Sequence, residues 1–131
     1  MSLGVMIVDD SGYMRANVAS ALDVPGFEIV AEAENGAVAV QKFKNNRRKI
    51  DLVMMDIVMR KANGVKATAA LNELDDDVKI IMCTSVGQKK KMKLAAKAGA
   101  DGYLIKPFTD EDVREAIRNV FEEDVLPRQI R

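Results

Sequence analysis

The chain has 131 residues, 48% of them hydrophobic and 31% charged, and its 20 basic residues balance its 20 acidic ones. This size and composition are typical of one folded domain with a substantial core, and the zero net charge favours neither nucleic acid nor a membrane surface as a partner. The absence of histidine excludes histidine-based metal sites and acid–base catalysis, and the single cysteine, Cys83, excludes an internal disulfide and predicts a buried structural thiol.

The first half of the chain alternates short apolar runs with stretches of helical spacing. Residues 5–8 (VMIV) predict a strand, and the residues after them share one helical face: Met14, Val18, Ala21 and Leu22. In residues 28–34 (EIVAEAE), the three glutamates would lie on one face of a strand, and Ile29, Ala31 and Ala33 would lie on the other. This alternation predicts a half-exposed edge strand. A weaker helix is expected after an Asn35-Gly36 turn, with an apolar face of Ala39, Val40 and Phe43.

The second half repeats this alternation with stronger signals. Residues 52–55 (LVMM) and 80–83 (IIMC) are unbroken apolar runs, which predict central strands covered on both faces. Helix faces are expected after them at two sets of residues: Ala67, Ala70, Leu71 and Leu74, and Met92, Ala95 and Ala96. Residues 103–105 (YLI) predict a fifth strand, and Thr109 and Asp112 have capping-box spacing before a last helix with five apolar positions: Val113, Ala116, Ile117, Val120 and Phe121.

Strands and helices that alternate five times predict parallel βαβ units with right-handed crossovers. The expected fold is a doubly wound α/β domain, in which ligands bind beyond the carboxyl ends of the strands. Polar residues follow the buried runs at those ends: Asp9, Asp10, Asp56, Thr84, Ser85 and Lys106. We therefore expect three carboxylates, a hydroxyl and an ammonium to meet at one edge of the sheet.

Three carboxylates without histidine or thiolate form a hard oxygen site suited to Mg²⁺. A carboxylate can be the nucleophile in phosphoryl transfer, and Asp56 is favoured because it follows the central strand. Each residue alone has a simpler interpretation. Asp9-Asp10-Ser11 could merely cap the first helix, Asp56 could be a loop carboxylate, Thr84 a strand end and Lys106 a solvated charge. Their convergence on one edge favours the site.

Four segments resemble the receiver domains of two-component response regulators, especially the single-domain chemotaxis response regulator. They are residues 8–15 (VDDSGYMR), 54–59 (MMDIVM) with Gly64, 83–85 (CTS) and 98–108 (AGADGYLIKPF). The resemblance covers the chain from Val5 to about Phe121. It implies a flavodoxin-like five-stranded parallel sheet of order 2-1-3-4-5 with five helices. It also implies a receiver domain over residues 1–124 and a C-terminal tail or linker stub over 125–131.

The same resemblance assigns roles in phosphoryl transfer. Asp56 would accept a phosphoryl group from a sensor histidine kinase, or from a small donor such as acetyl phosphate. Lys106 would contact a phosphoryl oxygen, and its peptide bond to Pro107 would be cis. The chain would catalyse only its own phosphorylation and a slow self-dephosphorylation, so it would not be an enzyme acting on other substrates.

The cofactor implied by the resemblance is Mg²⁺. Asp10, Asp56 and the backbone carbonyl of Val58 would hold the ion, and Asp9 would act mostly through a metal-bound water.

The implied switch is a shift of population between two packings. Thr84 would move toward the phosphoryl group and Tyr103 would turn inward into the space that Thr84 vacates. This would change the surface of the fourth helix, fifth strand and fifth helix, where a downstream protein target or output domain would bind. A cytoplasmic monomer or phosphorylation-linked dimer is expected, with no membrane partner and no direct contact with nucleic acid.

Some positions depart from the family pattern. Arg60 stands where a proline is common. Val58 and Val86 occupy the positions that tune phosphate lifetime in the family, and because neither side chain can orient a water, slow self-dephosphorylation is expected. Five lysines on or near the expected fourth helix form either a solvated face or a docking surface for an acidic partner patch: Lys89, Lys90, Lys91, Lys93 and Lys97.

Two other interpretations remain open at the level of sequence. One is an aspartyl-phosphate hydrolase of the haloacid-dehalogenase type, although such enzymes have a second aspartate where this chain has Val58. The other is the receiver fragment of a larger transcriptional or enzymatic regulator, because residues 122–131 (EEDVLPRQIR) could be a linker as well as a free end.

Overall fold

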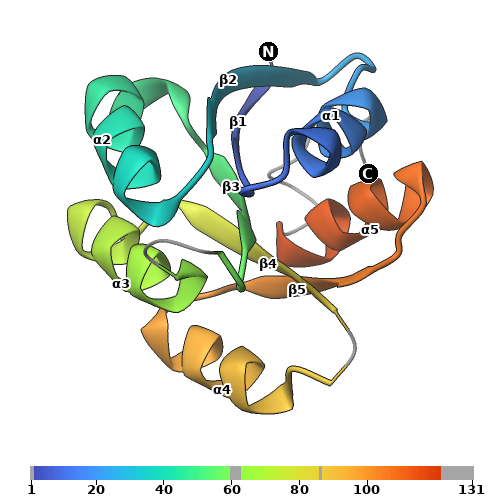
Figure 1. Ribbon diagram of the computed structural model, residues 1–131. Coiled ribbons are helices and arrows are strands. Elements are labelled where there is room, and N and C mark those ends of the chain that lie inside the picture. The colour runs from blue at the N-terminus through green and yellow to red at the C-terminus, as the bar shows by residue number, and fades with distance from the viewer. Residues whose placement is uncertain (1, 60–62, 86, 122–131) are drawn as a thin grey trace.

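The computed structural model describes residues 2–59, 63–85 and 87–121. One parallel sheet lies between two layers of helices, with α1 and α5 on one face and α2, α3 and α4 on the other (Figure 1). Arg60, Val86 and the expected tail at 125–131 lie outside the described residues.

The five strands are paired in the order β2-β1-β3-β4-β5, and every pairing is parallel. The strands are β1 Leu3–Val8, β2 Phe27–Ala33, β3 Leu52–Asp56, β4 Lys79–Ser85 and β5 Gly102–Lys106. The helices are α1 Gly12–Ala21, α2 Gly36–Asn46, α3 Gly64–Leu74, α4 Lys89–Ala98 and α5 Asp110–Val120, with a 3₁₀ turn, η1, at Arg47–Lys49. The predicted flavodoxin-like α/β fold and strand order are confirmed.

Each face of the sheet has its own core, which explains why the central strands are apolar without alternation. In β1, Val5 and Ile7 pack against α1 and α5, whereas Met6 and Val8 pack against the opposite layer. All five residues of β3 are buried for the same reason. At the edge of the sheet, β2 keeps its glutamates exposed, as the alternation in 28–34 predicted.

Two details of the helices differ from the expectation. Asn35 is the N-cap of α2, where its side chain accepts a hydrogen bond from the Val38 backbone N–H at 2.9 Å, so the Asn35-Gly36 pair begins the helix and is not a separate turn. Ala96 was expected in the core but is exposed, because α4 turns Ala95 toward the sheet. The capping box of Thr109 and Asp112 is present at the start of α5.

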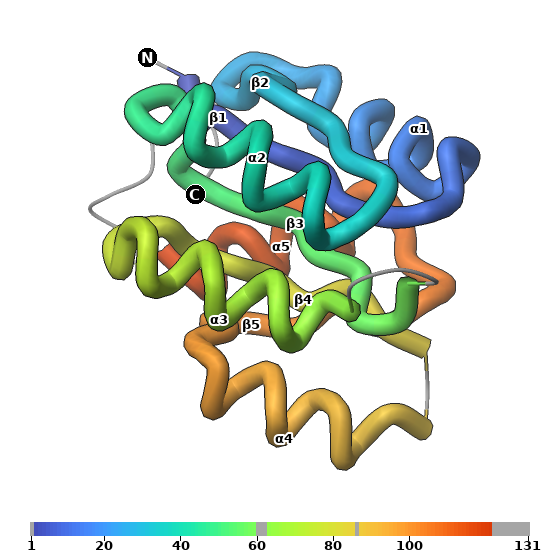
Figure 2. Tube along the Cα trace, turned by 60° about the vertical axis from the view of Figure 1, so that its left-hand side comes forward, coloured from blue at the N-terminus to red at the C-terminus, as the bar shows by residue number. Residues whose placement is uncertain are grey.

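The carboxyl ends of β1, β3, β4 and β5 meet at one edge of the sheet, and this edge carries the site. Figure 2 shows α2, α3 and α4 side by side along one face, with α4 next to the outer strand β5. Among the residues that the structure describes, no helix has the length and hydropathy needed to cross a bilayer.

Candidate functional site

In the turn after β1, one residue caps the following helix and a different residue contributes to the acidic site. Ser11 is the N-cap of α1, and its hydroxyl accepts a hydrogen bond from the Met14 backbone N–H at 3.2 Å. The backbone N–H of Ser11 donates to Asp9 Oδ1 at 2.9 Å, which fixes the Asp9 carboxylate. Ser11 therefore accounts for the cap, and the second oxygen of Asp9 is turned toward Lys106.

Asp56 is the last residue of β3, and only 5% of it is exposed. The start of α3 lies directly behind it, where the Gly64 backbone N–H donates to the carbonyl of Ile57 at 3.1 Å. A Cβ atom at Gly64 would lie 2.1 Å from the Asp56 carbonyl oxygen. Glycine at position 64 therefore lets the helix support the strand end that presents the Asp56 carboxylate.

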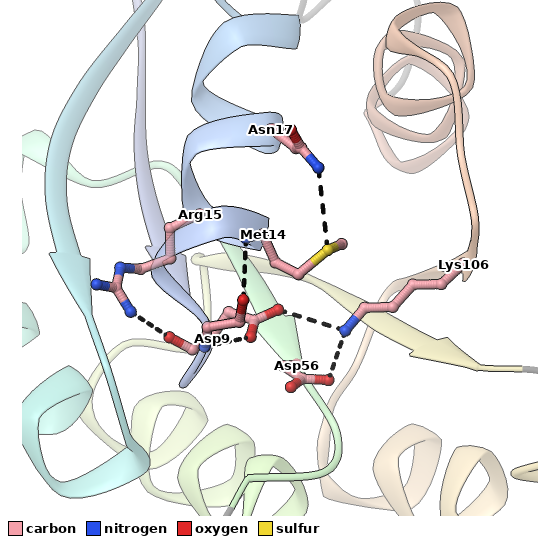
Figure 3. A network of polar contacts seen from close by, with 7 residues as sticks. Asp9, Met14, Arg15, Asn17, Asp56 and Lys106 are labelled. Atoms are coloured by element: carbon pink, nitrogen blue, oxygen red, sulfur yellow. Dashed lines mark hydrogen bonds and ion pairs between the residues drawn. The ribbon is translucent and has the colours of Figure 1, made fainter.

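Lys106 ends β5 and joins the two acidic strand ends. Its Nζ lies 3.3 Å from Asp9 Oδ2 and 3.3 Å from Asp56 Oδ1 (Figure 3). The following Lys106-Pro107 peptide bond is cis. Residues far apart in the sequence are thus joined by one ammonium group.

The electrostatics of this cluster favour cation binding. Burial and, to a smaller extent, the charge of Asp9 raise the pKa of Asp56 to about 6, because Lys106 opposes them only in part. Burial lowers the pKa of Lys106, but the carboxylates of Asp56 and Asp9 outweigh it, so the pKa is raised overall and the amine stays charged at neutral pH. The buried carboxylates are thus incompletely compensated by one lysine.

The nearby thiol takes no part in this chemistry. Cys83 is buried, and burial raises its pKa to about 12, so the thiolate does not form near neutral pH. The structure therefore agrees with the expectation of a structural cysteine.

A pocket of about 240 Å³ opens at this edge. It is lined by every predicted site residue except Tyr103 and Pro107. Three further residues also line it: Ser11, Met14 and Gln88. Ser85, which was placed at the same edge, lines it too. The four strand ends thus converge as the sequence pattern indicated.

The donor set in the pocket fits Mg²⁺. One carboxylate oxygen from each of Asp9, Asp10 and Asp56 lies within 4.8 Å of the others. These three side chains offer oxygen alone, which suits a hard divalent cation. Val58, whose carbonyl is a further expected ligand, lines the same pocket.

The two expected switch residues occupy different surroundings. Thr84 is buried in the pocket wall, where its hydroxyl donates to the Ser85 carbonyl at 3.3 Å. Tyr103 lies away from the pocket, half-buried against the α3–α4 side, and its hydroxyl donates to the Met92 carbonyl of α4 at 2.7 Å. The phenol therefore ties β5 to α4 in this conformation.

Sequence reasoning assigned no role to Arg15, although it lies within the quoted segment 8–15. Its guanidinium donates to the Asp9 carbonyl at 2.6 Å and to Glu32 at 3.2 Å. Two features of the sequence could have indicated these contacts. Arg15 lies one helical turn after the Ser11 cap, and the predicted edge strand carries glutamates at its exposed positions, with which an arginine can pair.

The strand order and the acidic pocket place the chain in the class of flavodoxin-like α/β domains that bind ligands at the carboxyl edge of the sheet. Residues 5–118 match the family model of the response regulator receiver domain, and the chain belongs to this family.

Curated relatives and solved structures agree with this assignment. The chain is 50% identical to the chemotaxis protein CheY of Halobacterium salinarum over 120 residues, which cover 92% of this chain and 98% of the relative. It is 43% identical to CheY of Bacillus subtilis, with 89% and 96% covered. A CheX–CheY–BeF₃–Mg²⁺ complex from Borrelia burgdorferi matches with a TM-score of 0.86 and 30% identity, covering 92% of this chain and 90% of that one. CheY4 of Vibrio cholerae matches with a TM-score of 0.82 and 27% identity, covering 92% and 100%.

Proposed function

We propose that this receiver domain is a phosphoacceptor switch of a two-component pathway, in which Asp56 takes a phosphoryl group from a sensor histidine kinase. The observation that carries the proposal is the position of the Lys106 ammonium, 3.3 Å from both Asp9 and Asp56, in a pocket whose three acids offer only oxygen ligands. Such a pocket can hold an ionised nucleophile and still neutralise an incoming phosphoryl group.

Each side chain has a defined part in this proposal. A carboxylate oxygen of Asp56 attacks phosphorus in line with the leaving group and becomes the bridging oxygen of an acyl phosphate. The bond from phosphorus to the donor breaks at the same time, and its electron pair stays on the departing imidazole nitrogen of the kinase histidine, or on the acetate oxygen when acetyl phosphate is the donor. Lys106 transfers its hydrogen bonds from the acids to a phosphoryl oxygen. Thr84, whose hydroxyl now donates to the Ser85 carbonyl, rotates to donate to another phosphoryl oxygen.

The proposed metal ligands are Asp10, Asp56 and the carbonyl of Val58, with Asp9 acting through a metal-bound water. When bound, Mg²⁺ would neutralise charge on the transferred group. The CheY relative from B. burgdorferi was solved with Mg²⁺ and BeF₃, which supports the same cation for this chain.

The change that a partner protein would recognise starts from the hydrogen bond between Tyr103 of β5 and the Met92 carbonyl of α4. When Tyr103 turns inward, its hydrogen bond to the Met92 carbonyl is lost, and α4 is free to shift against β5. The surface of α4, β5 and α5 then changes for a downstream protein, and the five exposed lysines of α4 favour an acidic patch on that partner. The B. burgdorferi relative was solved in complex with CheX, which supports a protein target.

We also propose that residues 1–124 are the receiver domain and that 125–131 are a tail or linker stub. The protein acts in the cytoplasm as a monomer or as a dimer linked to phosphorylation. Val58, which lies 48% exposed at the pocket, offers no carboxylate for the acid–base step of a haloacid-dehalogenase hydrolase.

The proposal is tested by intact-mass spectrometry after incubation with acetyl phosphate and Mg²⁺. We expect one phosphoryl group per chain, and none when EDTA removes the metal or when Asp56→Asn removes the nucleophile. Asp76→Asn is the matched control, because Asp76 is an exposed aspartate outside the pocket. Sustained hydrolysis of p-nitrophenyl phosphate without a labelled chain would contradict the proposal and favour the hydrolase.

A further inference from the structure

We propose that Arg15 is a positioning residue for the Mg²⁺ site and orients the Asp9–Asp10 acidic pair without entering the pocket. This inference depends on the proposed function, because it concerns the metal ligands of the same site. Arg15 does not line the pocket, and its guanidinium points to the backbone carbonyl of Asp9 (Figure 3). It also pairs with Glu32 of β2.

The guanidinium of Arg15 makes two fixed contacts. Nη1 donates to the backbone carbonyl of Asp9 at 2.6 Å, and Nε donates to Glu32 Oε1 at 3.2 Å. Only 22% of the Arg15 side chain is exposed, against 47% for Glu32. Because a guanidinium is planar and rigid, two contacts made through different nitrogens fix both its place and its orientation.

The carbonyl that Arg15 holds belongs to the peptide group that joins Asp9 to Asp10. The orientation of this peptide sets the direction in which the Asp10 side chain leaves the backbone. The other groups of Asp9 are held separately, because its N–H donates to the Ala33 carbonyl at 3.1 Å and its carboxylate accepts from Ser11 and Lys106. Arg15 thus contacts the peptide group between the two acids directly.

The other end of this contact is anchored in the sheet. Glu32 belongs to β2, which pairs with β1 at the edge of the sheet. The backbone carbonyl of Glu32 accepts a hydrogen bond from Lys42 Nζ of α2 at 2.5 Å. Arg15 therefore links the first acidic turn to a strand that is itself held by α2, so the acids keep their places before a cation arrives.

Charge and positioning predict opposite effects when Arg15 is removed. As a nearby positive charge, Arg15 repels a divalent cation, so its loss would tighten Mg²⁺ binding. As the residue that orients the two acids, its loss weakens Mg²⁺ binding, because partners that orient metal ligands typically change affinity by about tenfold or more. The sign of the change in affinity distinguishes the two roles.

The experiment is a calorimetric titration of the metal-free protein with MgCl₂. We expect Arg15→Met to raise the Kd for Mg²⁺ about tenfold. The matched control is Arg114→Met, because Arg114 also donates to a backbone carbonyl, that of Ala21 at 2.9 Å, and pairs with a glutamate, Glu111. Ala21 ends α1 on the side away from Asp9, so this control is expected to leave the Kd unchanged.

A second readout separates positioning from a general loss of stability. Mg²⁺ raises the unfolding temperature of a protein that binds it in the folded state. We expect this rise to shrink in Arg15→Met and to persist in Arg114→Met, even if both variants unfold at a lower temperature than the wild type without metal.

The outcomes are distinct. A wild type that binds no Mg²⁺ overturns both the proposed function and this inference. A wild type that binds Mg²⁺, together with an Arg15→Met variant that binds equally or more tightly, overturns this inference alone. If Arg15→Met does not fold, Arg15→Lys decides, because it keeps the charge but has one nitrogen for two acceptors: weaker binding supports the inference, and unchanged binding overturns it.

Discussion

The Nζ of Lys106, at the end of β5, lies 3.3 Å from Oδ1 of Asp56, at the end of β3, across 50 positions of sequence. The contact places an ammonium group of the pocket against the proposed nucleophile. Because burial makes an unpaired carboxylate costly, this ion pair helps Asp56 to remain ionised near neutral pH.

Removal of the Asp56 charge should stabilise the metal-free protein at neutral pH. Burial raises the pKa of Asp56 from 3.8 to about 6, so the folded protein binds this proton more tightly than the unfolded chain. The resulting stabilisation is full below about pH 4 and is lost as the pH rises through about 6. At about pH 7.5, Asp56→Asn should therefore be about 2 kcal/mol more stable than the wild type in urea unfolding with EDTA. The difference should shrink toward pH 4, and a constant difference would contradict the assignment.

Loss of the Lys106 ammonium should slow phosphorylation more than it weakens metal binding. Lys106→Met removes a donor to the phosphoryl group, and the loss of such a donor costs about 100-fold in rate. The measurement is the rate of labelling by acetyl phosphate at saturating Mg²⁺. Lys97→Met, on the exposed face of α4, is the control and should label at the wild-type rate.

An added methyl group at Gly64 should disturb the strand end that carries Asp56. Its Cβ would lie 2.1 Å from the Asp56 carbonyl oxygen, so the backbone must move. Gly64→Ala should cost about 2 kcal/mol in urea unfolding. Gly12→Ala is the control, since a Cβ there meets only a side-chain atom of Arg15 at 3.5 Å. Equal effects of the two substitutions would argue against close support of the strand by α3.

A carboxylate near the phosphoryl group should shorten the phosphorylated state. Val86 lies outside the described residues, and the resemblance to receiver domains predicts that the residue at this position tunes phosphate lifetime. Val58 at the pocket is apolar as well. Val86→Glu should speed self-dephosphorylation about tenfold, because a carboxylate can orient the attacking water. The decay of labelled protein after removal of acetyl phosphate measures this, and an unchanged or slower decay would contradict the mechanism.

The tie between Tyr103 and α4 should be measurable by amide hydrogen exchange. Tyr103→Phe removes the hydrogen bond to the Met92 carbonyl and should lower the opening free energy of α4 by about 1 kcal/mol. Tyr13→Phe is the control, because Tyr13 is 76% exposed. Equal exchange in α4 of both variants would show that the phenol does not restrain the helix.

The fold was predictable because the apolar runs of β1, β3 and β4 are buried on both faces, whereas β2 keeps its glutamates in the exposed phase. The convergence of Asp9, Asp56 and Lys106 followed from the rule that parallel strands end at one edge. The exposure of Ala96 was missed, because helical spacing alone does not say how wide the buried face of α4 is.

Arg15 was missed for a different reason. Its contacts join α1 to the backbone of the turn after β1 and to a side chain of β2, and the apolar pattern does not indicate how a charged side chain is oriented. The contact of Tyr103 was missed for the same reason. The apolar run 103–105 places Tyr103 in a strand, but it does not indicate that the hydroxyl donates to the Met92 carbonyl. Both contacts depend on the packing between neighbouring elements.

The central claim is that one carboxylate, Asp56, captures the phosphoryl group. Treatment of the protein with acetyl phosphate and Mg²⁺, followed by borohydride, reduces an acyl phosphate to the alcohol, and peptide mapping then locates the modified residue. We expect homoserine at position 56 in the wild type and no modification in Asp56→Asn. Homoserine at position 9 or 10, or an unmodified wild type under these conditions, would contradict it.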